Sequence, residues 1–166
     1  MDTYLAIVSK RDTRRYADKP IPADVVERIL NAGRVTGSAS NRQPWRFLVV
    51  KDAERREQLA DAVYEPTNIR GAQLLVAIAG ARPLDIGRCV QNMMLAAWNE
   101  NIGSCPNGIT DADACRAALG AGEEEQVATL LSFGFPAHPR DPRRRSPEEW
   151  VDRADRLPFD EVVEFR

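Results

Sequence analysis

AQLLVAIAG, from Ala72 to Gly80, is apolar at every position except Gln73. A short run of this kind, without alternation, predicts a strand that is covered on both faces. DIGRCVQNMMLAAWN, from Asp85 to Asn99, follows it and has apolar residues nearly all round a helix. Such a helix is expected at the centre of a protein or at a subunit contact. Together the two segments predict three layers with the sheet in the middle.

Further elements are expected on both sides of this pair. Residues 2–10 and 53–63 have the pattern of short helices, and 111–119 forms another with Thr110 or Asp111 as its N-cap. Ala23 to Arg34 follows two prolines and predicts a helix that buries Val25, Val26, Ile29 and Leu30. Trp45 to Lys51 and Val127 to Phe135 are expected strands, and 104–109 a short strand or loop. The order fits either an α/β or an α+β fold.

The tail from Pro136 to Arg166 is rich in proline and arginine. It is too polar to supply a core of its own, so we expect it to wrap over something. The apolar helix from Asp85 to Asn99 has more apolar surface than one small sheet is expected to cover. Both features predict a homodimer.

The composition narrows the possible functions. The chain has 166 residues, which suits a single domain over residues 1–166, and a formal net charge of −2, which favours neither nucleic acid nor a membrane surface. The first 15 residues do not have the pattern of a signal peptide, and the three cysteines form no CxxC pair, so a cytoplasmic location is expected. The only histidine is His138. A single histidine argues against a histidine-based metal site and against a Ser-His-Asp or Cys-His nucleophile. If the protein is an enzyme, a cofactor is therefore expected to supply the reactive group.

Four clusters hold the candidate functional residues. Lys10 to Tyr16 contains four cations and can form either a solvated helix end or an anion clamp. Thr36 to Trp45 is either a connecting loop or a surface whose amides read a planar heterocycle. Gly103 to Ile109 is a turn whose backbone amides could face a flavin, and Pro139 to Pro147 is a basic segment that could close over a phosphate.

The order of these clusters resembles the nitroreductase family of FMN-dependent oxidoreductases. The family's opening basic motif matches KRDTRRY from Lys10 to Tyr16, and its second motif matches GSASNRQPW from Gly37 to Trp45. The Asp-x-Gly and Gln-Asn pairs of the helix from Asp85 to Asn99 and the segment from Leu131 to Ala137 also match. The resemblance covers almost the whole chain. It implies an α+β fold of three layers (α/β/α) around a mainly antiparallel sheet, with the C-terminal tail wrapping the partner subunit.

The resemblance also implies a flavin site built across a homodimer, with no metal and no obligatory catalytic side chain. FMN would take hydride from NADH or NADPH at N5 and reduce a nitroaromatic, a quinone or a similar small-molecule acceptor by ping-pong kinetics. Lys10, Arg11 and Asp12 would lie along the ribityl-phosphate, and Arg14 at the pyrimidine edge. The remaining implied contacts are Ser38, Ser40, Asn41 and Gln43 from the second motif, Pro106, Asn107 and Gly108 beside the ring, and Arg143 and Arg145 on the phosphate.

The chain departs from the family pattern at three places. Asp12 replaces a small hydroxyl residue, Gly37 replaces a proline, and the segment between Val63 and Ala72 is shorter than in larger members. Asn68 and Arg70 in that segment are further candidates for a flavin contact. Two alternatives therefore stay open: a protein that binds or sequesters FMN without turnover, and a specialised flavin-dependent dehalogenase or oxidase.

Overall fold

Four antiparallel strands form the centre of the larger of two units in the chain, Arg11–Arg140. The structure is a computed structural model that describes all 166 residues. The strands are β1 (Arg46–Val50), β2 (Leu74–Ala79), β3 (Gly103–Asn107) and β4 (Val127–Gly134), and their order in the sheet is β1-β2-β4-β3. The fold is therefore α+β, as the family resemblance implied, because every strand pair is antiparallel.

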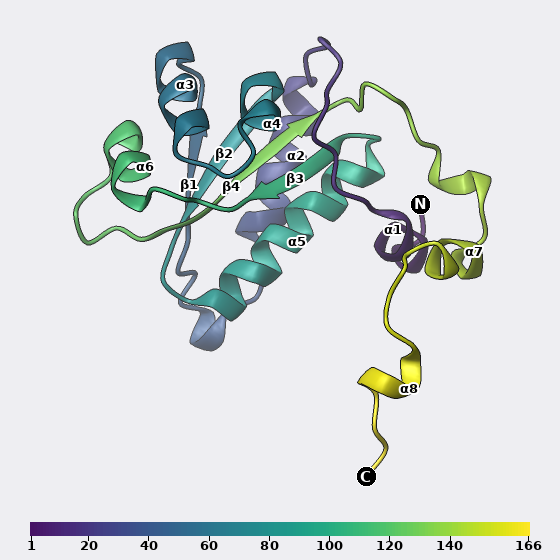
Figure 1. Cartoon of the computed structure of the whole chain (residues 1–166). Coiled ribbons are helices and arrows are strands. Elements are labelled where there is room, and N and C mark those ends of the chain that lie inside the picture. The colour runs from purple at the N-terminus through teal and green to yellow at the C-terminus, as the bar shows by residue number, and fades with distance from the viewer. The chain divides into compact units, whose positions relative to one another are not determined.

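The two faces of the sheet have separate hydrophobic cores, and different helices cover each face (Figure 1). Alternate residues of β2 point to opposite faces, so Val76 packs in one core and Leu75 in the other. One core lies under α2 (Ala23–Arg34) and α5 (Pro83–Asn99), and the other under α3 (Ala53–Asp61), α4 (Pro66–Gly71) and α6 (Ala112–Leu119). All six residues of β2 are buried, which confirms the prediction of a strand covered on both faces.

Most predicted elements agree with the structure to within a few residues. The α2 helix begins and ends where predicted and buries Val25 and Ile29, whereas Val26 and Leu30 are only partly buried. Asp111 is the N-cap of α6, and its carboxylate accepts a hydrogen bond from the Ala114 backbone N–H at 2.9 Å. The segment expected as a strand or loop at residues 104–109 is the strand β3.

The smaller unit combines Met1–Lys10 with Asp141–Arg166. It contains α1 (Thr3–Ser9), η2 (Pro142–Arg144), α7 (Pro147–Asp152) and α8 (Phe159–Val162). One residue of the tail, Trp150, is buried, and its indole N–H donates to the Pro142 carbonyl at 2.8 Å. A capping box between Ser146 and Glu149 starts α7 and so places this tryptophan.

Candidate functional site

The basic segment Arg11–Tyr16 runs along the outer edge of the sheet. Asp12 forms a parallel bridge with Ser104 of β3, and the Thr13 N–H donates to the Ser104 carbonyl at 3.0 Å. Arg14 is exposed, Asp12 is exposed through its side chain, and Arg11 is partly buried. The backbone of this segment is therefore fixed to the sheet while Arg14 and Arg15 are exposed to solvent, which suits an anion site.

Tyr16 anchors the far end of the same segment. Its hydroxyl lies 2.6 Å from the Thr13 carbonyl, 3.1 Å from the Ser132 carbonyl and 2.9 Å from Ser132 Oγ. Its ring packs so closely on Gly134 that a Cβ there would lie 2.7 Å from a ring carbon. Burial raises the pKa of Tyr16 well above its ordinary value, although the hydrogen bond with Ser132 opposes this shift. The phenol is therefore a neutral structural anchor, a role that the sequence did not reveal.

The loop after α2 carries the second motif and has a strained backbone. Ser40, Asn41 and Gln43 have φ angles of 54°, 53° and 49°, and the short η1 helix (Ala39–Asn41) lies within this stretch. The left-handed region costs a non-glycine residue on the order of 1–3 kcal/mol, although asparagine tolerates it better. Strain of this kind persists where the surroundings impose it and is common at ligand sites. The side chains of these three residues are exposed and Ser38 is partly buried.

At the end of β3, Pro106 and Gly108 are exposed, whereas Asn107 is buried. The Asn107 Nδ2 atom donates to the Cys105 carbonyl at 3.1 Å and to the Leu130 carbonyl at 3.0 Å. Both hydrogens of this amide are thus engaged within the sheet. The side chain of Asn107 therefore links β3 to β4, whereas Pro106 and Gly108 are the residues of this segment that are exposed to solvent.

Asn68 on α4 is fully buried, yet neither Nδ2 nor Oδ1 has a hydrogen-bond partner. The helix begins at Glu65, whose carboxylate accepts from the Thr67 N–H at 3.1 Å. These hydrogen bonds lower the pKa of Glu65, and the positive charges of Arg14 and Arg15 lower it further. The arginine segment and the start of α4 therefore lie within electrostatic range of each other.

Arg70, the other candidate in this segment, is held on α3. Its guanidinium lies 2.7 Å from Glu57 Oε2 and 2.9 Å from Asp61 Oδ1. Both carboxylates belong to surface residues, so this arginine takes part in a surface ion-pair network. Of the two candidates, Asn68 has the unused hydrogen-bonding capacity.

The remaining predicted residues belong to the smaller unit. Lys10 is the C-cap of α1 and is partly buried. The Arg143 backbone N–H donates to Asp141 Oδ1 at 2.9 Å, and its side chain is exposed. The Arg145 guanidinium lies 5.0 Å from the centre of the Trp150 ring, a cation–π contact that orders this side chain.

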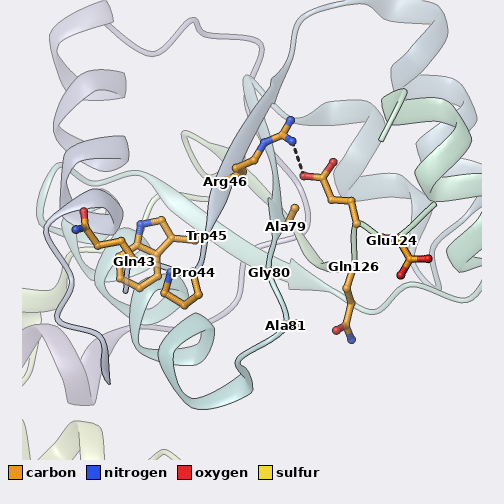
Figure 2. A pocket seen from close by; sticks show the side chains of 10 residues that line it. Gln43, Pro44, Trp45, Arg46, Ala79, Gly80, Ala81, Glu124 and Gln126 are labelled. Atoms are coloured by element: carbon orange, nitrogen blue, oxygen red, sulfur yellow. Dashed lines mark ion pairs between the residues drawn. The ribbon is translucent and has the colours of Figure 1, made fainter. Parts of the chain in front are cut away.

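A pocket of about 350 Å³ opens beside the exit of the strained loop (Figure 2). Residues 43–46, 79–81 and 124–126 line it, and Arg46 Nη1 pairs with Glu125 Oε1 at 2.9 Å on one side. Gly80, one of the lining residues, has a φ angle of 153°. Only Gln43 among the predicted site residues reaches this pocket, so it is not the site that the sequence indicated.

Comparisons with known proteins agree with this geometry. The model of the nitroreductase family matches residues 7–83 and 77–135. A protein of Archaeoglobus fulgidus, provisionally named an NADH dehydrogenase/NAD(P)H nitroreductase, is 29% identical over 149 residues that cover 81% of this chain and 86% of that protein. The NADH dehydrogenase of Thermus thermophilus is 24% identical, and the match covers 91% of this chain and 95% of that protein.

A provisionally named nitroreductase of Desulfovibrio desulfuricans, solved in complex with FMN, has the same fold. Its TM-score is 0.82 at 26% identity, and the match covers 100% of this chain and 98% of that one. The chain described here belongs to the nitroreductase family of oxidoreductases. Among its helices, none combines the length and the apolar character needed to cross a bilayer.

Proposed function

We propose that this protein is an FMN-dependent oxidoreductase that uses NADH or NADPH to reduce a nitroaromatic, a quinone or a similar small acceptor. The observation that carries the proposal is the buried Asn68 amide, which lacks any partner. An unpaired buried polar group costs about 1–3 kcal/mol, so such a group is retained where a ligand can satisfy it. The FMN-bound Desulfovibrio protein, which matches this chain along its whole length, supports flavin as that ligand.

The residues present fit FMN. Its phosphate is a dianion, for which Arg11 is the candidate cation in the larger unit; Lys10, Arg143 and Arg145 are the candidates in the smaller unit. Its pyrimidine ring carries both donors and acceptors, which match an amide such as Asn68. The outward-facing Arg14 provides a cation for the same ring edge.

In the proposed mechanism the protein supplies position and charge. Bound FMN supplies a two-electron carrier that accepts hydride from the nicotinamide and donates it to the second substrate. Arg14 favours the reduced, more negatively charged state of the ring by its positive charge. Asp12 keeps the arginine segment on the sheet through its backbone bridge with Ser104, so its carboxylate is not required to touch the phosphate.

We further propose a homodimer in which Ser38, Ser40 and Asn41 contact the flavin of the other subunit. The tail leaves Leu157, Phe159, Val162 and Phe165 exposed by 62–87%, an apolar surface that a second copy of the chain can cover. The β1 strand is an edge of the sheet, and Val49 on it is also exposed. The mass in solution should therefore be twice 18.5 kDa, or about 37 kDa. Phe159→Asp with Phe165→Asp should shift it toward the monomer, and a monomeric native protein would contradict the dimer.

The test of the flavin site is an equilibrium titration of the purified protein with FMN, followed by absorbance. Arg14→Ala should weaken FMN binding about ten-fold, because it removes one charge-assisted contact. Arg34→Ala serves as the matched control, since Arg34 lies at the exposed end of α2 and bonds only Asn31. If Arg14→Ala and Arg34→Ala weakened FMN binding equally, the proposed contact between Arg14 and the flavin would be wrong. If the protein bound FMN tightly but neither NADH nor NADPH reduced it, the alternative of a protein that sequesters FMN would be supported instead.

A further inference from the structure

The strained loop from Thr36 to Trp45 makes few hydrogen bonds of its own, and they include three short-range backbone bonds between residues 38 and 45. Within it, the Gln43 N–H donates to Ser38 Oγ at 2.8 Å, and Gln43 Nε2 donates to the Asn41 carbonyl at 3.2 Å. Both bonds are exposed to water, which competes for the same groups. Three left-handed residues in so short a stretch therefore need support from a neighbouring element.

That support comes from one face of α5. Asn92 Nδ2 donates to Thr36 Oγ1 at 2.8 Å, where Thr36 is 5% exposed. One turn earlier, the Arg88 guanidinium packs against Gly37, and one turn before that Asp85 Oδ2 accepts the Ala39 N–H in a long hydrogen bond of 3.4 Å. The spacing 85, 88 and 92 places the three side chains on the same face of the helix. The loop runs along this face in the opposite direction.

Asp85 is well placed for such a role. Its side chain is 7% exposed, and Arg88 Nη1 lies 3.8 Å from its other oxygen. A carboxylate that is buried this deeply needs hydrogen-bond donors around it, and the loop provides one through its backbone. The carboxylate and the loop therefore stabilise each other.

The exit of the loop is fixed from the sheet. A Cβ on Gly80 would lie 2.1 Å from the Pro44 carbonyl oxygen, so only glycine allows this approach, and Gly80 lies beside Pro44 in the pocket (Figure 2). The Gly80 N–H itself donates to the Gln126 carbonyl at 2.8 Å. The loop is thus held at its entry, its middle and its exit.

We propose that Asp85 and Asn92 are positioning residues that hold the Thr36–Trp45 loop in its strained form, and thereby preset Ser38, Ser40 and Asn41 for the flavin. The inference rests on the proposed function for the flavin contact. It gives a role to Asp85 of the Asp-x-Gly pair and to Asn92 of the Gln-Asn pair, neither of which belongs to the predicted cofactor contacts. Preorganisation of this kind strengthens binding because the ligand does not have to order the loop.

The first experiment uses the flavin-free protein and so does not depend on FMN. Trypsin can cut after Arg42, which is exposed within the loop, and cleavage there reports loop opening. Asp85→Ala and Asn92→Ala should each accelerate this cleavage about five-fold, the effect of one lost hydrogen bond. Cleavage after Arg34, outside the loop, is the internal reference. Asp85→Asn, which keeps an acceptor for the Ala39 N–H, and Gln91→Ala, on an exposed neighbour, should cleave as the wild type does.

The second experiment measures FMN affinity in the same variants. Affinity should fall in Asp85→Ala and Asn92→Ala by about the factor found in the cleavage assay, and Asp85→Asn should restore it. Unchanged cleavage after Arg42 in both alanine variants would overturn the positioning role. Faster cleavage with unchanged FMN affinity would overturn the link to the flavin. If the wild-type protein bound no FMN, the proposed function would fail, whereas the cleavage assay would still decide whether α5 holds the loop.

Discussion

Asn68→Leu should stabilise the flavin-free protein and weaken FMN binding at the same time. In the wild type, both polar atoms of the Asn68 side chain are buried without partners. Leucine has a similar volume and removes this unpaired amide, whose burial costs about 1–3 kcal/mol. For a chain of this size, each kcal/mol changes Tm by about 2–4 °C. We therefore expect Tm of the flavin-free protein to rise by at least about 2 °C.

The same change removes the hydrogen bonds that the amide offers to the flavin. One or two lost bonds, at about 0.5–1.5 kcal/mol each, should weaken FMN binding roughly 2- to 160-fold. Thermal unfolding followed by circular dichroism and an FMN titration measure the two effects separately. Opposite signs in the two assays distinguish a ligand-facing amide from a structural one.

Asn107→Leu is the matched control, because Asn107 is also buried but its amide donates to two backbone carbonyls. This variant removes both of those hydrogen bonds and should lower Tm by several degrees. If Asn68→Leu lowered Tm as Asn107→Leu does, the Asn68 amide would be partnered in the protein and the reasoning would be refuted.

Three further predictions concern the stability of the chain. Tyr16→Phe should cost about 1–2 kcal/mol, because it removes the hydroxyl that joins Thr13 to Ser132, whereas Tyr64→Phe, at an exposed tyrosine, should leave Tm unchanged. The pKa of Tyr16 is raised in the folded state, so the contribution of this phenol to the free energy of unfolding is complete below pH 10.0 and is lost as the pH rises further. Stability should therefore fall more steeply with alkaline pH in the wild type than in Tyr16→Phe. Burial raises the pKa of Cys89 and Cys115 to about 11, so both thiols should resist iodoacetamide at pH 8 until the chain is unfolded, and rapid labelling of the native protein would contradict this. Trp150→Ala should lower the stability of the smaller unit by about 3–5 kcal/mol. Hydrogen exchange should then show lost protection over residues 142–152, with protection of β2 and β4 unchanged. Persistent protection of residues 142–152 would contradict the burial of the Trp150 side chain.

The sheet and its main helices could be predicted because their burial patterns are regular. The α2 helix has period 3.6 in its apolar residues, and β2 is apolar throughout, so each sequence permits one structure. The α4 helix was missed because PTNIRG is only six residues long and carries a buried asparagine. Its start could have been found, since Pro66 at the first helical position follows Glu65 as the N-cap.

The tail shows a different limit. The Ser146 to Glu149 spacing is a capping box that can be read from the sequence, and it precedes Trp150. The average polarity of the segment concealed one well-buried residue. Composition alone therefore does not indicate this residue, whereas the local motif does.

The candidate residues were found through the family resemblance, and their surroundings required the structure. Nothing in the spacing of Asn41 and Gln43 indicates that both have positive φ, because glutamine rarely adopts that region and asparagine, although it tolerates the region, adopts it only at some positions. The partners of Asp85 and Asn92 are 46 and 56 residues away in the sequence, a separation that no local pattern encodes. The sequence motif therefore indicates which loop residues could contact a ligand, whereas the residues that hold the loop in place are known only from the structure.

The most direct measurement of the central claim is the anaerobic absorbance spectrum of the FMN-loaded protein before and after NADH or NADPH. The account predicts that one nicotinamide bleaches the flavin bands within the mixing time of a manual experiment, and that a quinone or a nitroaromatic restores them. If the protein bound FMN but neither nicotinamide bleached it, the proposed oxidoreductase activity would be contradicted. If the protein did not bind FMN at all, the flavin site itself would be contradicted.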